Sequence, residues 1–162
     1  MRIGVSGHQS LGCPETVDWV REQMVQHLQT HDVSAGISSL ANGADQLFAS
    51  AIVERQISLE VVIPCERYEE TFNNPTALSS YQMLLSAAAA KRVLNFAEPS
   101  EEAFLEAGRL IVDSSDAMVL VWDGNPAAGR GGTGDIAEYA SVRGRPYFWL
   151  NPRNRTSSNV PV

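Results

Sequence analysis

The sequence predicts an α/β fold built on a mainly parallel sheet, and three observations support this class. Short apolar runs alternate with segments whose apolar residues recur at helical spacing, which is typical of a parallel sheet covered on both faces. The 162 residues are 44% hydrophobic and 19% charged, a composition that suits one globular domain with a sizeable core. Small or polar loops follow several of the apolar runs. Together these observations predict a Rossmann-like three-layer α/β/α sandwich with about six strands.

The first half of the chain accounts for three strands and two helices. Residues 2–6 form a short apolar run that stops at a glycine, so we expect a buried strand there. Pro14 suits the first turn of a helix that continues to about residue 30. Residues 33–40 supply the second strand, residues 44–55 the second helix, and residues 59–64 a third strand that ends in proline.

The second half continues the alternation after a less regular stretch. Residues 65–72 are expected to form one or two helical turns. The remaining elements are a helix ending near residue 90, a strand at 92–96, a helix capped by Ser100 that runs to about residue 114, a strand at 117–122, a helix at 134–142 and a strand at 146–150. Residues 1–150 therefore form a single domain, and residues 151–162, rich in Asn, Ser, Pro and Arg, are expected to be a C-terminal tail.

The charge and cysteine content narrow the classes of partner. The chain has 12 Lys and Arg against 19 Asp and Glu, a net charge of −7, which argues against extended nucleic-acid binding but not against a small nucleotide. Cys13 and Cys65 lack metal-ligand spacing and are expected to be free thiols, and we expect no metal and no cofactor. No apolar run is long enough to cross a membrane, and residues 1–2 lead into a strand rather than a signal peptide. The expected location is the cytoplasm.

Ligands of parallel α/β sheets bind outside the carboxyl ends of the strands. The candidate rim therefore consists of the loops at 7–13, 41–45, 64–72 and 123–135. The first of them is preceded by Ser6 and begins with Gly7 and His8. A hydroxyl group and bare backbone N–H groups at this position can cradle a phosphate. His8 either contacts an anion or a base, or is an ordinary loop histidine exposed to water.

The next two loops add polar groups to the same rim. Asn42, Gly43 and Asp45 open the second helix. Gly43 allows the close approach of a ligand, and Asp45 either caps its own helix or hydrogen-bonds a ribose hydroxyl. Pro64 and Asp123 follow the third and fifth apolar strands, so both are expected at this edge of the sheet.

The most distinctive stretch lies between the fifth strand and the last helix. Its expected ligand-binding residues are Gly131, Gly132, Thr133, Gly134 and Asp135. Glycines permit close approach, and the free N–H groups of the following helical turn favour an anion, although a plain strand-to-helix turn would use the same residues.

Two acidic residues and one arginine near this loop are the candidates for chemistry. Glu138 lies three residues beyond Asp135, which places both carboxylates on one helix face. They either hold sugar hydroxyls, act on an N-glycosidic bond, or merely complement the helix dipole. Arg109, on the preceding helix, either pairs with a phosphate or faces solvent.

Several stretches resemble signatures of the SLOG superfamily, the Rossmann-like group that joins the DNA-processing Smf/DprA proteins with the LONELY GUY cytokinin-activating phosphoribohydrolases. Residues 38–45 are similar to Ser-Gly-Leu-Ala-x-Gly-Ile-Asp of the DNA-processing branch, and residues 131–138 to Gly-Gly-x-Gly-Thr-x-x-Glu of the phosphoribohydrolase branch. Residues 113–119 look like the stretch before the fifth strand in uncharacterised members. With the opening at 4–7, the resemblance covers most of residues 2–150. A weaker similarity, to nucleoside deoxyribosyltransferases, rests on Thr133 and Glu138.

The resemblance implies a nucleotide or nucleotide-derived ligand at the carboxyl edge of the sheet, and a homodimer or higher homo-oligomer. One hypothesis is a protein that binds or senses this ligand. The alternative is a hydrolase or transferase acting on the N-glycosidic bond of a nucleoside monophosphate, with Glu138 carrying the chemistry and Arg109 orienting the phosphate. Asp135 stands where the phosphoribohydrolase motif has threonine, and an acid there repels phosphate, so binding is favoured over catalysis. A third class is an interaction protein whose glycines are structural.

Overall fold

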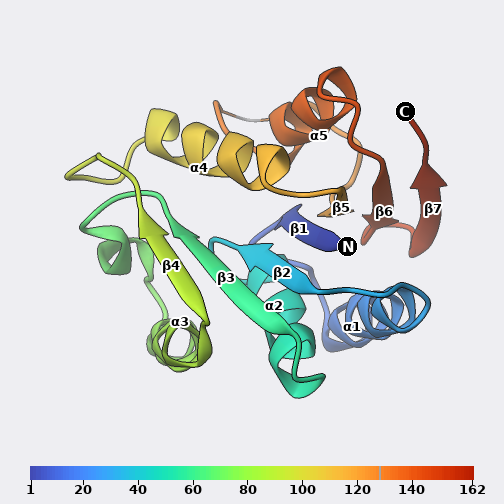
Figure 1. Cartoon of the computed structure of the whole chain (residues 1–162), viewed down its shortest axis with the longest axis horizontal. Helices are drawn as coiled ribbons and strands as arrows, with labels where there is room; N and C mark the ends of the chain where they lie inside the picture. The colour runs from blue at the N-terminus through green and yellow to red at the C-terminus, as the bar shows by residue number, and fades with distance from the viewer. Residues whose placement is uncertain (128) are drawn as a thin grey trace.

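The chain forms a seven-stranded sheet between two layers of helices (Figure 1). The computed structural model describes residues 1–127 and 129–162, so Ala128, within the expected rim loop 123–135, lies outside the description. The strands are β1 (Arg2–Gly7), β2 (Ala35–Ser38), β3 (Ser58–Ile63), β4 (Ala90–Val93), β5 (Ala117–Val121), β6 (Tyr147–Asn151) and β7 (Thr156–Val160). The helices are α1 (Pro14–Gln29), α2 (Ala44–Glu54), the 3₁₀ turn η1 (Tyr68–Thr71), α3 (Pro75–Ala87), α4 (Glu101–Asp113) and α5 (Thr133–Val142). The predicted three-layer α/β/α sandwich is confirmed.

The order of the strands fixes where a ligand can bind. The sheet runs β4-β3-β2-β1-β5-β6-β7, and every neighbouring pair is parallel except β6 and β7. The chain adds β2, β3 and β4 on one side of β1, and then returns to add β5 and β6 on the other side. Strand order therefore reverses between β1 and β5. Crevices outside the carboxyl ends of strands at such a switch point are the binding sites of open α/β sheets.

Helices cover both faces of the sheet. α1, α2 and α3 lie on one face, and α4 and α5 lie on the other (Figure 1). The interior strand β5 shows the consequence, because Val119 packs into the core cluster that contains Phe48, whereas Met118 packs into the cluster that contains Ile136. Successive side chains of a strand point to opposite faces. A strand covered on both faces is therefore apolar at every position, as the run 117–121 is.

Several elements differ in their bounds from the sequence-based expectation: β2 is shorter than 33–40, and α3 ends at Ala87 rather than near residue 90. Two segments differ most. β4 spans Ala90–Val93 rather than 92–96, because its ladder with β3 ends at the pair Ile63↔Val93. The expected tail 151–162 contains β7, which pairs antiparallel with β6 from Asn151↔Thr156 to Tyr147↔Val160. The polar run Thr156–Val160 carries no apolar pattern because it is an edge strand with mostly exposed side chains, held by its ladder to β6.

Two further findings concern membrane-spanning helices and the two cysteines. Within residues 1–127 and 129–162, the structure contains no helix with the length and apolar character needed to span a membrane. Cys13 is exposed and Cys65 is buried, and both are free thiols, as the sequence predicts.

Candidate functional site

A cleft of about 770 Å³ opens at the switch point of the sheet. Its walls come from the carboxyl ends of β1 and β5, the loops after β2 and β3, the glycine-rich loop before α5, and one side of α4. Most of the residues that the sequence predicts as ligand-binding lie on it, namely Ser6, Gly7, His8, Asn42, Asp45, Pro64, Asp123, Gly131, Gly132, Thr133 and Gly134. Motifs that are far apart in the sequence thus meet around one hollow.

Gly43, which was expected to let a ligand approach, serves instead to let two loops approach each other. Its φ is +83°, and an added Cβ would collide with the backbone carbonyl oxygens of His8 and Gln9. The Ala44 N–H donates to the His8 carbonyl oxygen at 3.1 Å in the same contact. Only glycine adopts this φ without strain, so Gly43 joins the loops after β1 and β2 rather than lining the cleft.

The glycine-rich loop is likewise shaped by contacts within the protein. Gly131 has φ +84°, and an added Cβ would lie 2.7 Å from the backbone nitrogen of Leu105 in α4. The Gly131 N–H donates to the Asp135 Oδ2 at 2.8 Å. Asp135 therefore does not line the cleft as expected, because its carboxylate turns back to fix the loop that precedes its own helix.

The two residues expected to carry catalysis lie away from the cleft. Ile136, Ala137 and Ala140 are the buried side of α5, and Glu138 falls on the exposed side. Arg109 points between α4 and α5, where its Nη1 donates to Glu106 Oε1 at 2.9 Å and its guanidinium lies 5.3 Å from the centre of the Tyr139 ring. The structure therefore does not bring these two side chains to a ligand in the cleft.

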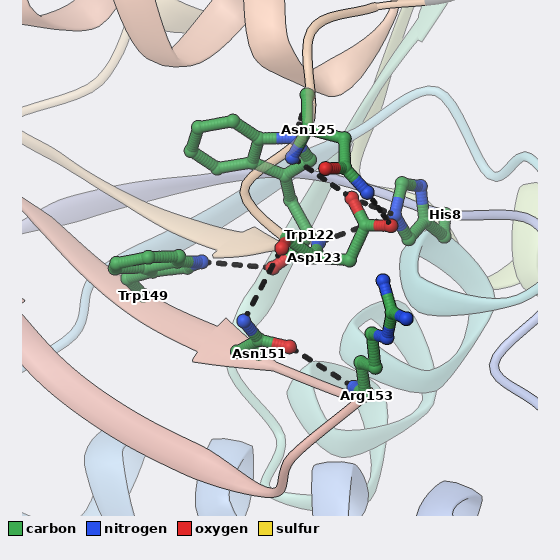
Figure 2. A network of polar contacts seen from close by, with 7 residues as sticks. All are labelled: His8, Trp122, Asp123, Asn125, Trp149, Asn151 and Arg153. Carbon is green, nitrogen blue, oxygen red and sulfur yellow. Dashed lines mark hydrogen bonds and ion pairs between the residues drawn. The ribbon is translucent and has the colours of Figure 1, made fainter.

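A polar network fixes the rim between β1, β5 and β6 (Figure 2). The His8 Nε2 lies 3.2 Å from the Asp123 amide nitrogen and 3.3 Å from Asp123 Oδ1. The Asn125 N–H and side-chain amide donate to the Asp123 carboxylate at 3.1 and 2.7 Å. The Asn125 backbone N–H is the main reason that the pKa of Asp123 lies below its ordinary value, so this carboxylate is charged.

The network continues to the far strand of the parallel sheet. The Asn151 side chain donates to the Asp123 carbonyl oxygen at 3.3 Å and accepts from the Arg153 N–H at 3.0 Å (Figure 2). The Trp149 indole donates to the Trp122 carbonyl oxygen at 2.8 Å. These bonds hold the end of β5 in place, so the His8–Asp123 contact is a fixed part of the rim.

Asp45 lies at the floor of the cleft in an unusual setting. The residue is only 6% exposed, and its Oδ2 accepts from the Ala41 N–H and the Ser38 hydroxyl, each at 3.3 Å. Burial raises the pKa of Asp45 to about 7, against the opposing effect of these hydrogen bonds. Leu40, between the two donors, has φ +58°, a left-handed conformation that costs a bulky residue roughly 1–2 kcal/mol. The loop accepts this strain in a conformation that turns the Ala41 N–H toward Asp45.

Aromatic side chains, which the sequence analysis did not single out, form one end of the cleft. Tyr68 and Phe72 follow β3, and Phe104 projects from α4. The Tyr68 ring centre lies 5.4 Å from that of Phe72 and 6.5 Å from that of Phe104. Tyr68 falls in the predicted rim loop 64–72, so its position at the strand end was the available signal. Phe104 lies mid-helix, and its part in the cleft follows only from the packing of α4 over the sheet.

The charges around the cleft are mixed. Arg130 and His8 supply cationic or hydrogen-bonding groups, whereas Glu101 and Asp123 supply acidic ones. Among residues 1–127 and 129–162, no three His, Cys, Asp or Glu side chains are grouped so that they could hold a metal ion. The cleft is thus suited to an organic ligand with both an anionic group and hydrogen-bond donors.

Comparison with known proteins identifies solved structures that have a similar fold. Neither protein families nor curated proteins give a match to this chain. Among solved structures, DNA processing protein A from Helicobacter pylori, described by its single-stranded DNA binding mode, matches with a TM-score of 0.64 and 18% identity over 93% of this chain and 65% of its own. The fold is similar to that of DNA processing protein A.

Two further solved structures agree with this finding. DNA processing protein A from Streptococcus pneumoniae gives a TM-score of 0.64 and 17% identity over 93% of this chain and 50% of its own. TM1055, a structural genomics target, gives 0.58 and 15% over 90% of this chain and 71% of its own. The chain thus spans between half and two thirds of the two DNA processing proteins. The resemblance carried by the sequence motifs is confirmed at the level of the fold.

Proposed function

We propose that this protein binds a nucleotide, or a nucleotide-derived ligand with a ribosyl phosphate, in the cleft between β1 and β5. The single observation that carries the proposal is the cleft itself. It lies at the switch point of the sheet, and four loops that the sequence marks as ligand-binding line it together. Its volume of about 770 Å³ falls in the usual range for small-molecule sites.

The glycine-rich side of the cleft suits the phosphate. Gly132 precedes the first turn of α5 and provides no side-chain cap, and Thr133 and Gly134 of that turn line the cleft. The first N–H groups of a helix carry a partial positive charge and bind anions. The exposed Arg130 lines the same side and adds a guanidinium that can bind phosphate oxygens in a bidentate manner.

The aromatic end of the cleft suits the base. Phe104 and Phe72 are partly exposed aromatic rings on the cleft, next to the buried ring of Tyr68. Stacking of a base on an aromatic ring contributes roughly 1–3 kcal/mol. Phosphate and base ends lie on either side of β1, so that a ribose between them would lie over the switch point.

Other functions fit the molecule less well. A net charge of −7 disfavours the many phosphate contacts of an extended DNA strand, the ligand class of the H. pylori neighbour. The glycosidase alternative assigned the chemistry to Glu138, and that side chain is exposed on the far side of α5. A single nucleotide unit held without turnover at Glu138 is the function that the geometry favours.

Calorimetric titration with nucleoside monophosphates tests the proposal, and Arg130→Gln tests the phosphate end. We expect Arg130→Gln to weaken binding by about tenfold, the value of one charge-assisted hydrogen bond. Arg55→Gln is the matched control, because the equally exposed Arg55 caps the other end of α2, roughly 16 Å from the cleft edge.

Two results would contradict the proposal. One is the absence of any heat or thermal shift with nucleotides at millimolar concentration. The other is tight binding of an oligodeoxynucleotide that weakens steeply with salt while mononucleotides do not compete, since that result would indicate a strand-binding surface instead.

A further inference from the structure

Two titratable side chains of the cleft lining, Asp45 and Tyr68, are buried. Asp45 is 6% exposed and Tyr68 is 4% exposed, and both line the cleft. Buried polar groups in native proteins are nearly always hydrogen-bonded, and each exception calls for an explanation. The rim residues Asn42 and Arg130, by contrast, are exposed to solvent.

Each of the two side chains keeps hydrogen-bonding capacity that the described residues 1–127 and 129–162 do not fill. The Ser38 hydroxyl and the Ala41 N–H donate to Asp45 Oδ2, and the Ser39 backbone also lowers the pKa of this carboxyl group; Oδ1 still has the capacity to accept a further hydrogen bond. The Tyr68 hydroxyl makes no hydrogen bond within that part of the chain, and neither atom is among its fully enclosed unpartnered atoms. Since both residues line the cleft, a ligand could hydrogen-bond with the acceptor position of Asp45 and with the hydroxyl group of Tyr68.

The two side chains line the same cleft, Asp45 after β2 and Tyr68 after the neighbouring strand β3. The pKa of Tyr68 is raised well above its ordinary value, first by burial and next by the negative charge of Asp45. The phenol therefore stays protonated and acts as a donor toward a ligand acceptor. Asp45 accepts at Oδ1 in its ionised form, which predominates above about pH 7. A ligand that satisfies both must present a donor beside an acceptor.

We propose that Asp45 and Tyr68 read the edge of a base that carries an exocyclic amino group next to a ring nitrogen, as adenine and cytosine do. The amino group donates to Asp45 Oδ1, and the Tyr68 hydroxyl donates to the ring nitrogen. Hypoxanthine and uracil present the reverse order, with an oxygen acceptor beside an N–H donor, so their oxygen would face the carboxylate. This inference rests on the proposed nucleotide function and adds the class of base.

The surroundings favour a base rather than a sugar at this position. Tyr68 packs between Phe72, Phe104 and Tyr81, whose ring centres lie 5.4, 6.5 and 5.6 Å from its own. Flat apolar walls match a stacked base. Asp45 follows β2 and the glycine-rich loop follows β5, two strand spacings or roughly 10 Å away across β1. A ribose can bridge that distance between a base and its phosphate.

The test compares ligands that differ only in the amino group. At about pH 8, where Asp45 is mostly ionised, we expect wild-type protein to bind AMP at least about tenfold more tightly than IMP, and CMP more tightly than UMP, because the wrong base leaves a buried carboxylate unpaired. Tyr68→Phe removes only the hydroxyl group. It should therefore weaken the binding of AMP by about tenfold and leave the affinity for IMP nearly unchanged. Tyr81→Phe is the matched control, since Tyr81 is 2% exposed but does not line the cleft.

Asp45→Asn makes the sharper prediction. The Ala41 N–H can only donate, so it keeps the amide oxygen of the asparagine at the Oδ2 position. The amide NH₂ then takes the place of Oδ1 and presents a donor where the wild type has an acceptor. We expect this variant to reverse the preference, so that IMP binds more tightly than AMP.

The outcomes separate this inference from the proposed function. Equal affinity for AMP and IMP in the wild type would overturn the reading of the base and leave nucleotide binding intact. So would an unchanged AMP-to-IMP ratio in Tyr68→Phe, which also decides the case if Asp45→Asn fails to fold. A loss of affinity for 2′-deoxy-AMP without discrimination against IMP would assign the two side chains to the ribose and overturn the proposal. No binding of any nucleotide by the wild type would overturn both.

Discussion

Asp45→Asn without ligand gives a quantitative test of the buried carboxyl group. Burial raises the pKa of Asp45 from an ordinary value of 3.8 to about 7. The folded protein therefore holds a proton that the unfolded chain releases between about pH 4 and pH 7, and the free energy of unfolding falls as the pH rises through that window. A shift of this size corresponds to about 4 kcal/mol at most.

Asparagine keeps the shape and the acceptor for Ala41 but cannot ionise. We therefore expect Asp45→Asn and wild type to have similar stabilities near pH 4, and the variant to be more stable by up to about 4 kcal/mol near pH 8. Urea denaturation followed by fluorescence, at both pH values, measures the difference. Other titrating groups affect both proteins equally, so they cancel in the comparison.

Asp18→Asn is the matched control, because Asp18 is exposed on α1. It should change stability by less than about 0.5 kcal/mol at either pH. If Asp45→Asn were instead destabilised near pH 8, or if its difference from wild type did not depend on pH, the carboxyl group would be an ordinary charged helix cap and the reasoning would fail.

Four other predictions follow from named contacts. Gly131→Ala should destabilise the protein by about 1–3 kcal/mol more than Gly12→Ala in thermal unfolding, because both have φ near +85° to +90° but only Gly131 meets a neighbour, Leu105. Burial, and then the nearby His31, lower the pKa of His27 to about 4, so the folded state favours the neutral ring and loses stability as the pH falls below about 6.5; His27→Gln should remove about 1–2 kcal/mol of that loss in denaturation at about pH 4.5, after solvent screening. AMP affinity should rise with pH through about 7 in wild type but not in Asp45→Asn, because the amino group binds the ionised carboxylate. Glu138→Gln should leave nucleotide affinity within about twofold by calorimetry, since the side chain is exposed outside the cleft.

The order of the elements followed from the sequence because burial on both faces leaves a simple pattern. The run 117–121 is apolar at every position, which is typical of a strand buried on both faces. Strand β7 was not predicted because nothing buries it, and the residues Thr156–Val160 show no periodicity. Strand β7 forms because it pairs with β6, and the local sequence of residues 156–160 gives no sign of that pairing.

The position of the candidate site was predictable from the sequence only where it follows from the topology of the sheet. Residues at strand ends, such as His8 and Asp123, were found because topology brings every carboxyl end to one edge. Phe104 was missed because its place depends on how α4 crosses the sheet. Glu138 was placed by its spacing from Asp135, and spacing along a helix does not say which face of that helix meets the cleft.

Gly43 affects how rigid the cleft would be when a ligand binds. Its bare Cα lies against the His8–Gln9 backbone, and the Ala44 N–H closes the contact, so the loops after β1 and β2 are locked together. His8 and Asp45, on opposite sides of that contact, cannot be displaced independently. A binding site that is preorganised in this way loses little conformational entropy when a ligand binds. If the proposed binding holds, we expect related ligands to differ mainly in their rates of dissociation.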